Sequence, residues 1–132
     1  MNGWGLALLV AGAGAFGALG RVLFDDAGLA LARRREGVRG LGAWPWALLL
    51  INVLGSFVLG LLTGALPSGS IWLVVLGAGW CGGFTTFSTW AVLIGADLLA
   101  RRWRRAAFTV AAHLVLGLVA AALGLALARG WS

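Results

Sequence analysis

The chain has 132 residues, of which 61% are hydrophobic and 11% charged, and its mean hydropathy is +0.99. This balance excludes an ordinary soluble domain, in which about a quarter of the residues are charged. The formal net charge is +6, and the basic residues are all arginines that cluster near the ends of apolar runs. Anionic lipid headgroups are therefore favoured as partners over nucleic acid.

Four apolar runs are each long enough to cross a bilayer as a helix, with short charged or Gly/Pro-containing breaks between them. We predict an all-α membrane protein forming a single domain over residues 1–132, with transmembrane helices at about 3–23, 44–66, 71–98 and 106–128. The first run has no basic residue ahead of it and is too long for the apolar part of a signal peptide, so we expect it in the mature protein.

The arginines predict the orientation of these helices. The loops after the first and third runs are rich in arginine, whereas the opposite side has Arg129 alone. By the positive-inside rule both loops are cytoplasmic and both termini face outward. Asp97 is expected to cap the third helix in a solvated position beside the third-loop arginines. The two loop sets are Arg33, Arg34, Arg35 and Arg39, and Arg101, Arg102, Arg104 and Arg105.

The first run contains GAGAFG at residues 12–17, which fits the GxGxxG pattern of dinucleotide-binding loops. Such a loop needs a strand before it and a helix after it, whereas these glycines lie inside one continuous apolar run. Small residues that let two membrane helices approach closely explain the pattern better.

In the second run, Asn52, Ser56, Gly60 and Thr63 with Gly64 recur at spacings of three and four and share one helix face. Polar side chains are costly against lipid, so this stripe is expected to meet protein or water. Two interpretations remain open, namely hydrogen bonding between helices and a polar track for a permeating solute.

The third run reads GAGWCGGFTTFSTW over residues 77–90, and two glycines followed by Thr and Ser favour a broken helix. We expect residues 82–89 to be unwound in the middle of the membrane. Unwound backbone there must line a cavity or be buried in protein. Its carbonyls suit a monovalent cation such as sodium, and the flanking helix ends offer positive dipole to an anion. A continuous helix with a glycine-mediated crossing is the alternative.

Aromatic and polar side chains near the break are further candidates. Phe87 and Trp90 project from one face, and the electropositive edges of their rings can contact an anion. Simple packing explains such a pair equally well. On the fourth run Thr109, His113 and Gly117 share a face, and His113 has no second ligand or carboxylate nearby in sequence.

Three segments, GAFGALGRVLF, NVLGSFVLG and GWCGGFTTFSTW, together resemble the signature segments of the CrcB/Fluc family of fluoride channels. The resemblance implies a passive channel of the inner (plasma) membrane that exports cytoplasmic fluoride. It also implies an antiparallel, dual-topology dimer of two four-helix subunits with two pores. At its centre the carbonyls of Gly82 and Thr85 would coordinate a structural sodium ion that is not transported.

The same matching implies roles for single residues. Asn52 corresponds to the polar pore residue of the second helix and Phe87 to the first of two pore aromatics. Thr86, Ser88 and Thr89 follow the family's polar run, and Arg21 closes the first helix motif as a structural residue.

The chain departs from the family pattern in three respects. Trp90 stands where the family usually has a second Phe. Thr109 and His113 stand about where the family commonly has Tyr and Ser, and these two residues can still donate hydrogen bonds to fluoride. The arginine bias favours one membrane orientation, whereas an antiparallel homodimer needs both. A homodimer and a heterodimer with a paralogous subunit of opposite topology both remain open, the latter including a non-conducting or single-pore subunit.

Other function classes fit the sequence less well. A small proton-coupled multidrug exporter needs an intramembrane carboxylate, and none of Asp25, Asp26, Glu36 and Asp97 lies in mid-span. The runs contain no acid–base pair, activated nucleophile or metal cluster, so an enzyme is not expected. A purely structural or assembly subunit remains open.

Overall fold

The computed structural model describes residues 2–36 and 45–130. Within these ranges four helices have the length and hydropathy of a membrane span, which confirms the all-α membrane fold. Each of their ends lies within three residues of its predicted position. The spans are Gly3–Asp26, Trp46–Ala65, Ile71–Leu99 and Trp103–Gly130.

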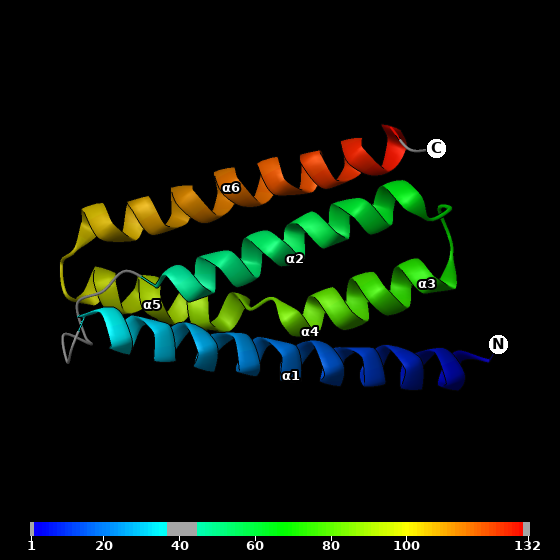
Figure 1. Ribbon diagram of the computed structural model, residues 1–132, viewed down its shortest axis with the longest axis horizontal. Coiled ribbons are helices and arrows are strands. Elements are labelled where there is room, and N and C mark those ends of the chain that lie inside the picture. Colours follow the sequence, from blue (N-terminus) through cyan, green and yellow to red (C-terminus); the bar gives the residue numbers. More distant parts are fainter. Residues whose placement is uncertain (1, 37–44, 131–132) are drawn as a thin grey trace.

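Successive spans run in opposite directions, so the two chain ends lie at one end of the bundle and the turn into the last span lies at the other (Figure 1). Helix α1 (Gly3–Glu36) continues well past the predicted end of its span. The extension is rich in Ala, Leu and Arg, which are strong helix formers. Most of the predicted first loop is therefore helix, while Arg39 lies outside the described residues. The other long helices are α2 (Trp46–Ala65) and α6 (Trp103–Gly130).

The third span is built from four pieces, α3 (Ile71–Leu73), a π-helical stretch η1 (Val74–Cys81), α4 (Gly82–Phe84) and α5 (Phe87–Leu99). Within this span the backbone is extended only at Thr85, with φ −78° and ψ 164°, and at Thr86, with φ −144° and ψ 121°. The predicted break is confirmed, but the prediction that residues 82–89 are all unwound is wrong in extent.

Two adjacent threonines confine the break. The amide and the hydroxyl of Thr85 both donate to the Cys81 carbonyl, each at 2.9 Å, and so close the helix before it. The Thr86 hydroxyl accepts from the Thr89 amide at 3.3 Å and so caps the start of α5. The Thr85 hydroxyl adds a second donor to the Cys81 carbonyl before the break, and the Thr86 hydroxyl replaces a backbone acceptor at the start of α5, so the residues on either side can stay helical.

Glycines bring α1 into backbone contact with the third span. A Cβ atom on Gly17 would overlap the Trp80 carbonyl, and one on Gly83 would overlap the Gly14 carbonyl. Helices can approach this closely only where both surfaces lack side chains. The close-approach interpretation of the GAGAFG motif is confirmed, and its glycines lie inside α1 rather than in a nucleotide loop.

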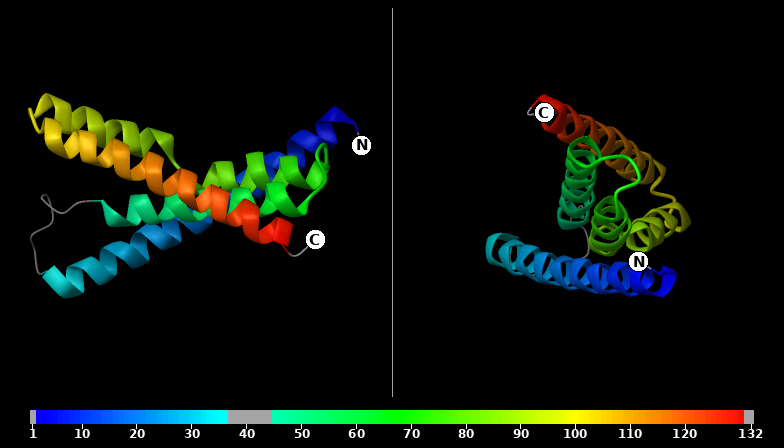
Figure 2. Two further views of the ribbon diagram at one scale, coloured as in Figure 1. Left: turned by 90° about the horizontal axis from the view of Figure 1, so that it is seen from above. Right: turned by 90° about the vertical axis from the view of Figure 1, so that its right-hand side faces the viewer.

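A second glycine contact joins α2 to α6. A Cβ atom on Gly60 would overlap the Ala121 carbonyl, and one on Gly124 would overlap the Phe57 carbonyl. Helix α1 covers η1 and α4, whereas α6 covers α2 and α5, so the two halves of the third span have different neighbours (Figure 2). The break lies where the span passes from one neighbour to the other.

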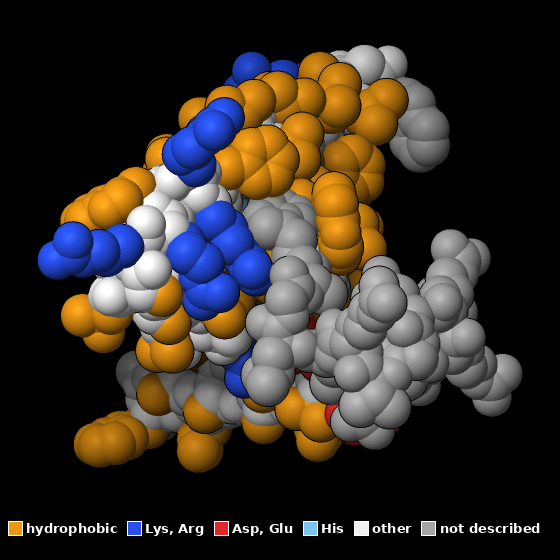
Figure 3. All heavy atoms as spheres, turned by 90° about the vertical axis from the view of Figure 1, so that its left-hand side faces the viewer, with side chains coloured by type: hydrophobic (Ala, Val, Ile, Leu, Met, Phe, Trp, Pro, Cys, Tyr) orange, Lys and Arg blue, Asp and Glu red, His pale blue; other side chains and the backbone are white. Residues whose placement is uncertain are grey.

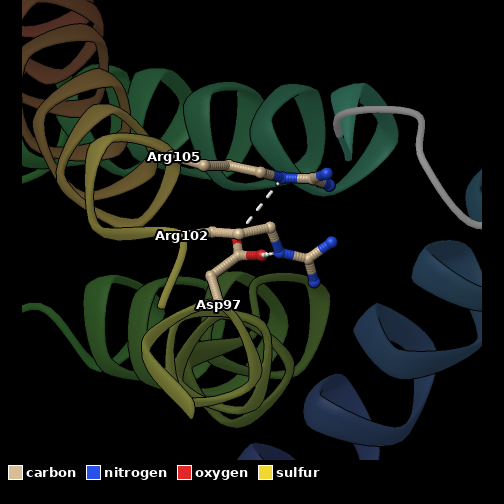
Figure 4. A network of polar contacts seen from close by, with 3 residues as sticks. All are labelled: Asp97, Arg102 and Arg105. Carbon is tan, nitrogen blue, oxygen red and sulfur yellow. Dashed lines mark ion pairs between the residues drawn. The ribbon is translucent and has the colours of Figure 1, made fainter. Parts of the chain in front are cut away.

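An ion-paired turn holds α5 against α6. The Asp97 carboxylate is 2.9 Å from Nε of Arg102 and 3.3 Å from Nε of Arg105 (Figure 4). The predicted position beside the arginines is confirmed, but the prediction that Asp97 is solvated is wrong, because the residue is only 6% exposed. The tight turn folds both arginines over the carboxylate and excludes water from it.

Candidate ion pathway at the helix break

Asn52 on α2 bonds to both main-chain groups of Thr86. Its Oδ1 accepts from the Thr86 amide at 2.9 Å, and its Nδ2 donates to the Thr86 carbonyl at 3.2 Å. A helix break inside a bilayer leaves backbone groups without partners, and each one costs free energy unless another group satisfies it. The side-chain amide of Asn52 provides both the acceptor for the Thr86 amide and the donor for the Thr86 carbonyl.

The same contacts remove helical donors from two carbonyls near the break. In a continuous helix the Thr86 amide would donate to the Gly82 carbonyl, but here it donates to Asn52. Likewise the Thr89 amide, which would serve the Thr85 carbonyl, donates to the Thr86 hydroxyl. A Cβ atom on Gly82 would meet no atom within 4 Å, so the surface there is open. Gly82 and Thr85 thus fit a cation site made of carbonyl oxygens.

The Thr86 hydroxyl is the centre of a small polar network. Besides the Thr89 amide, it contacts the Ser88 hydroxyl and the Thr89 hydroxyl, each at 3.2 Å. Thr86 itself is buried, whereas Ser88 and Thr89 are exposed on the first turn of α5. The network fixes the hydroxyl groups at the start of α5 without using any ionised group.

A cleft of about 390 Å³ opens beside the break, between α2, the third span and α6. It brings together seven of the predicted site residues, which come from three helices. Polar groups and aromatic rings therefore line the same cleft, although they lie far apart in the sequence. These residues are Asn52, Gly82, Thr85, Thr86, Phe87, Trp90 and His113.

Three rings line the cleft in a row. The ring centroids of Phe87 and Trp90 are 5.2 Å apart, and those of Trp90 and His113 are 6.2 Å apart. Phe87 is 75% exposed, although it is a large apolar side chain at the edge of a polar break. The indole Nε1 of Trp90 is buried and has no hydrogen-bond partner among the described residues. The row therefore places three aromatic rings against the space of the cleft.

Four predicted site residues lie outside the lining of the cleft. Ser88 and Thr89 belong to the network at the start of α5. Thr109 is buried, and its carbonyl oxygen is 2.8 Å from Nδ1 of His113 one turn later, so it positions the imidazole from behind. Arg21 is half-buried on α1, one turn beyond the contact of Gly17 with the third span.

Some lining residues were not predicted as site residues. Ser56 follows Asn52 by one helical turn and lines the same cleft, as the shared face of the stripe indicated. Gly55 also lines it, and a Cβ atom there would overlap the Thr85 methyl group. The rest of the stripe diverges, because Gly60 and Gly64 pack against α6 while Thr63 is exposed and donates to its own helix.

Comparison with known proteins places this site in a family. The family model described as CrcB-like protein, Camphor Resistance (CrcB), matches residues 8–125. The chain is 46% identical to "Fluoride-specific ion channel FluC 1" of Symbiobacterium thermophilum, over 94% of this chain and 96% of the relative. It is 38% identical to "Fluoride-specific ion channel FluC 1" of Thermobifida fusca, over 95% and 96%. It is 39% identical to "Fluoride-specific ion channel FluC" of Prosthecochloris aestuarii, over 96% and 95%.

These relatives are named as ion channels, which agrees with the prediction that the chain is not an enzyme. Four spans and a family match over most of the sequence describe a multi-pass protein of the plasma membrane. The resemblance carried by the three sequence segments is therefore confirmed, and the chain belongs to the CrcB family.

Proposed function

We propose that this protein is a subunit of a fluoride-selective channel that lets cytoplasmic fluoride leave the cell passively. The observation that carries the proposal is the cleft beside the Asn52–Thr86 bridge, where neutral donors and ring edges converge at a helix break. Relatives that align along nearly the whole chain are named for this activity. Cytoplasmic fluoride can leave through such a channel down its own electrochemical gradient. Its export then needs no coupling to proton transport.

The chemistry of the cleft suits a small anion that loses part of its water. Fluoride accepts strong hydrogen bonds, and selectivity in a pore depends on how well wall groups replace the hydration shell. Phe87 and Trp90 offer ring edges, and Ser56 offers a hydroxyl from α2. Because none of these groups carries a full charge, the anion is stabilised without being trapped.

A structural sodium ion fits the same break. The carbonyls of Gly82 and Thr85 have lost the donors that a continuous helix would supply. Oxygens of this kind suit a monovalent cation, and the open surface at Gly82 leaves room for a second subunit to supply the same pair. The bound cation would supply fixed positive charge between the two pores and would not be transported.

The subunits would form an antiparallel dimer. Most arginines lie in the loops after the first and third spans, on one side of the membrane, which favours a single orientation, so a companion of opposite bias fits better than a second copy. Labelling of a terminal tag on this chain expressed alone tests the choice. Access from one side only supports the companion, whereas equal access from both sides contradicts it and leaves a homodimer.

The channel activity is tested by fluoride efflux from liposomes that hold the purified protein, with chloride efflux as the selectivity control. Phe87→Ile removes the ring and its edge but keeps an apolar side chain. We expect it to reduce fluoride efflux at least tenfold. Phe16→Ile is the matched control, because Phe16 on α1 is 74% exposed against 75% for Phe87 and does not line the cleft.

The same efflux assay, with and without a paralogous subunit, distinguishes the remaining possibilities. Fluoride efflux from liposomes of this chain alone supports a self-sufficient channel. Efflux that appears only after co-expression with a paralogous subunit supports a heterodimer. No fluoride efflux in either case contradicts the proposed function and favours a structural subunit, and unchanged efflux in Phe87→Ile removes this ring from the pathway.

A further inference from the structure

Four arginines gather where α5 turns into α6, at the end of the molecule that faces the viewer in Figure 3. They are not equivalent. Asp97 pairs with Arg102 and Arg105, whereas Arg101 and Arg104 are exposed and contact no carboxylate among the described residues. The Asp97 carboxylate balances only part of this positive charge.

The position of the arginines on α6 is electrostatically unfavourable. The helix begins at Trp103 and runs for 28 residues, and its first turn holds no acidic residue. The N-terminal end of a helix carries partial positive charge, so Asp and Glu are favoured there and arginine is not. Arg104 and Arg105 lie in this first turn. An external anion at this end would relieve the repulsion.

The backbone at Arg101 adds a second cost. The Arg101 amide donates to the Leu98 carbonyl at 3.0 Å, and the Arg102 amide donates to the Asp97 carbonyl at 2.7 Å. This is a Schellman motif, and its left-handed position is usually glycine. Here Arg101 has a φ of 56°. The Arg101 side chain strains the turn, and because it is exposed it does not contribute to packing. Its positive charge is therefore the property that can explain why arginine occupies this position.

Apolar side chains flank the free arginines. Leu99 is 89% exposed and Trp103 is 62% exposed, and both lie at the boundary of a membrane span. Tryptophan is typical of the membrane interface, where its ring lies among the headgroups. The surface formed by Leu99, Arg101, Trp103 and Arg104, named here the turn patch, therefore combines positive charge with exposed apolar area at headgroup depth.

We propose that the turn patch binds the headgroup of an anionic phospholipid. Arg101 and Arg104 pair with the lipid phosphate, and Trp103 and Leu99 lie against the start of its acyl chains. The charge of the patch favours an anionic lipid over a zwitterionic one. The apolar side chains favour a lipid over a free anion such as inorganic phosphate or fluoride.

Thermal unfolding of the purified full chain in a neutral detergent tests the site. Added phosphatidylglycerol is expected to raise the midpoint temperature by several degrees, because a ligand that binds only the folded state stabilises it. Phosphatidylcholine and inorganic phosphate at the same concentration are the comparison arms. The gain from phosphatidylglycerol is expected to fall by at least half in Arg104→Gln, and to stay in Arg129→Gln at the other end of α6.

Arg101→Gly gives a test with opposite signs. Without lipid it should raise the midpoint temperature, because glycine adopts the left-handed position freely. With phosphatidylglycerol it should gain less than the natural chain does. The proposal is overturned if Arg101→Gly and Arg104→Gln both keep the full gain, or if phosphatidylcholine or inorganic phosphate stabilises the protein as much as phosphatidylglycerol.

Discussion

Replacing Asn52 by Leu tests whether one side chain maintains the helix break. Leu has nearly the same shape as Asn but neither its donor nor its acceptor. The variant therefore removes both bonds to Thr86, at 2.9 and 3.2 Å, with little change in volume. The Thr86 amide and carbonyl lose these partners at the middle of the span.

The cost follows from the number of groups left without partners. A buried main-chain group that loses its hydrogen bond costs about 1–3 kcal/mol, so two such groups cost about 2–6 kcal/mol. Asn52 is half-buried rather than fully enclosed, and water in the cleft offsets part of this loss. We expect the free energy of unfolding to fall by about 2–4 kcal/mol.

The stability measurement is a titration of unfolding in mixed detergent micelles, with fluoride efflux from liposomes as the second readout. Thr63→Val is the matched control on the same helix. Thr63 is exposed and its hydroxyl donates only to Leu59 of its own helix, at 2.7 Å. Its loss is expected to change the free energy of unfolding by less than about 0.5 kcal/mol.

The expected result is loss of both stability and efflux in Asn52→Leu, with both retained in Thr63→Val. A stable Asn52→Leu variant without efflux would mean that Asn52 acts on the anion rather than on the break. If Asn52→Leu matched the natural chain in both measurements, the account of how the break is satisfied would be refuted.

Two further predictions concern the scaffold. Gly17→Ala is expected to lower the free energy of unfolding by about 1–3 kcal/mol, because its Cβ would overlap the Trp80 carbonyl. Gly12→Ala is the control and should be neutral or stabilising, because its Cβ would have no atom within 4 Å. Equal unfolding midpoints for the two variants would contradict the close contact at Gly17. Asp97→Asn is expected to lower the free energy of unfolding by about 2 kcal/mol, because it removes the charge that both arginines face. The loss should persist at high salt, because the carboxylate is buried.

The four spans and the position of the break could be predicted from the sequence. Long apolar runs specify membrane helices because a bilayer leaves the backbone no other partners. Two adjacent threonines after two glycines located the break, because their hydroxyls compete with the backbone for hydrogen bonds. The extent of the break could not be predicted, because Gly82 and Gly83 remain helical, and only the tertiary structure shows Gly83 packed against Gly14 of α1.

The tertiary structure decided which polar groups meet. Asn52 and Thr86 are 34 residues apart, and only the packing of α2 against the break pairs them. The polar stripe of α2 looked uniform in the sequence, yet Ser56 lines the cleft while Gly60 contacts α6. The spacing of residues in the sequence shows which of them lie on the same face of a helix. It does not show which helix packs against that face at each level, because this depends on how the helices are placed along one another.

Asp97 makes the same distinction at the end of the bundle. Its place among arginines followed from the sequence alone, because charged residues collect where a chain leaves the membrane. Its burial did not, because water is excluded only after the turn through Arg101 folds Arg102 and Arg105 over the carboxylate. The sequence thus determined what each helix is made of and where it ends, and three-dimensional packing determined which of its groups are dry, paired or open to a solute.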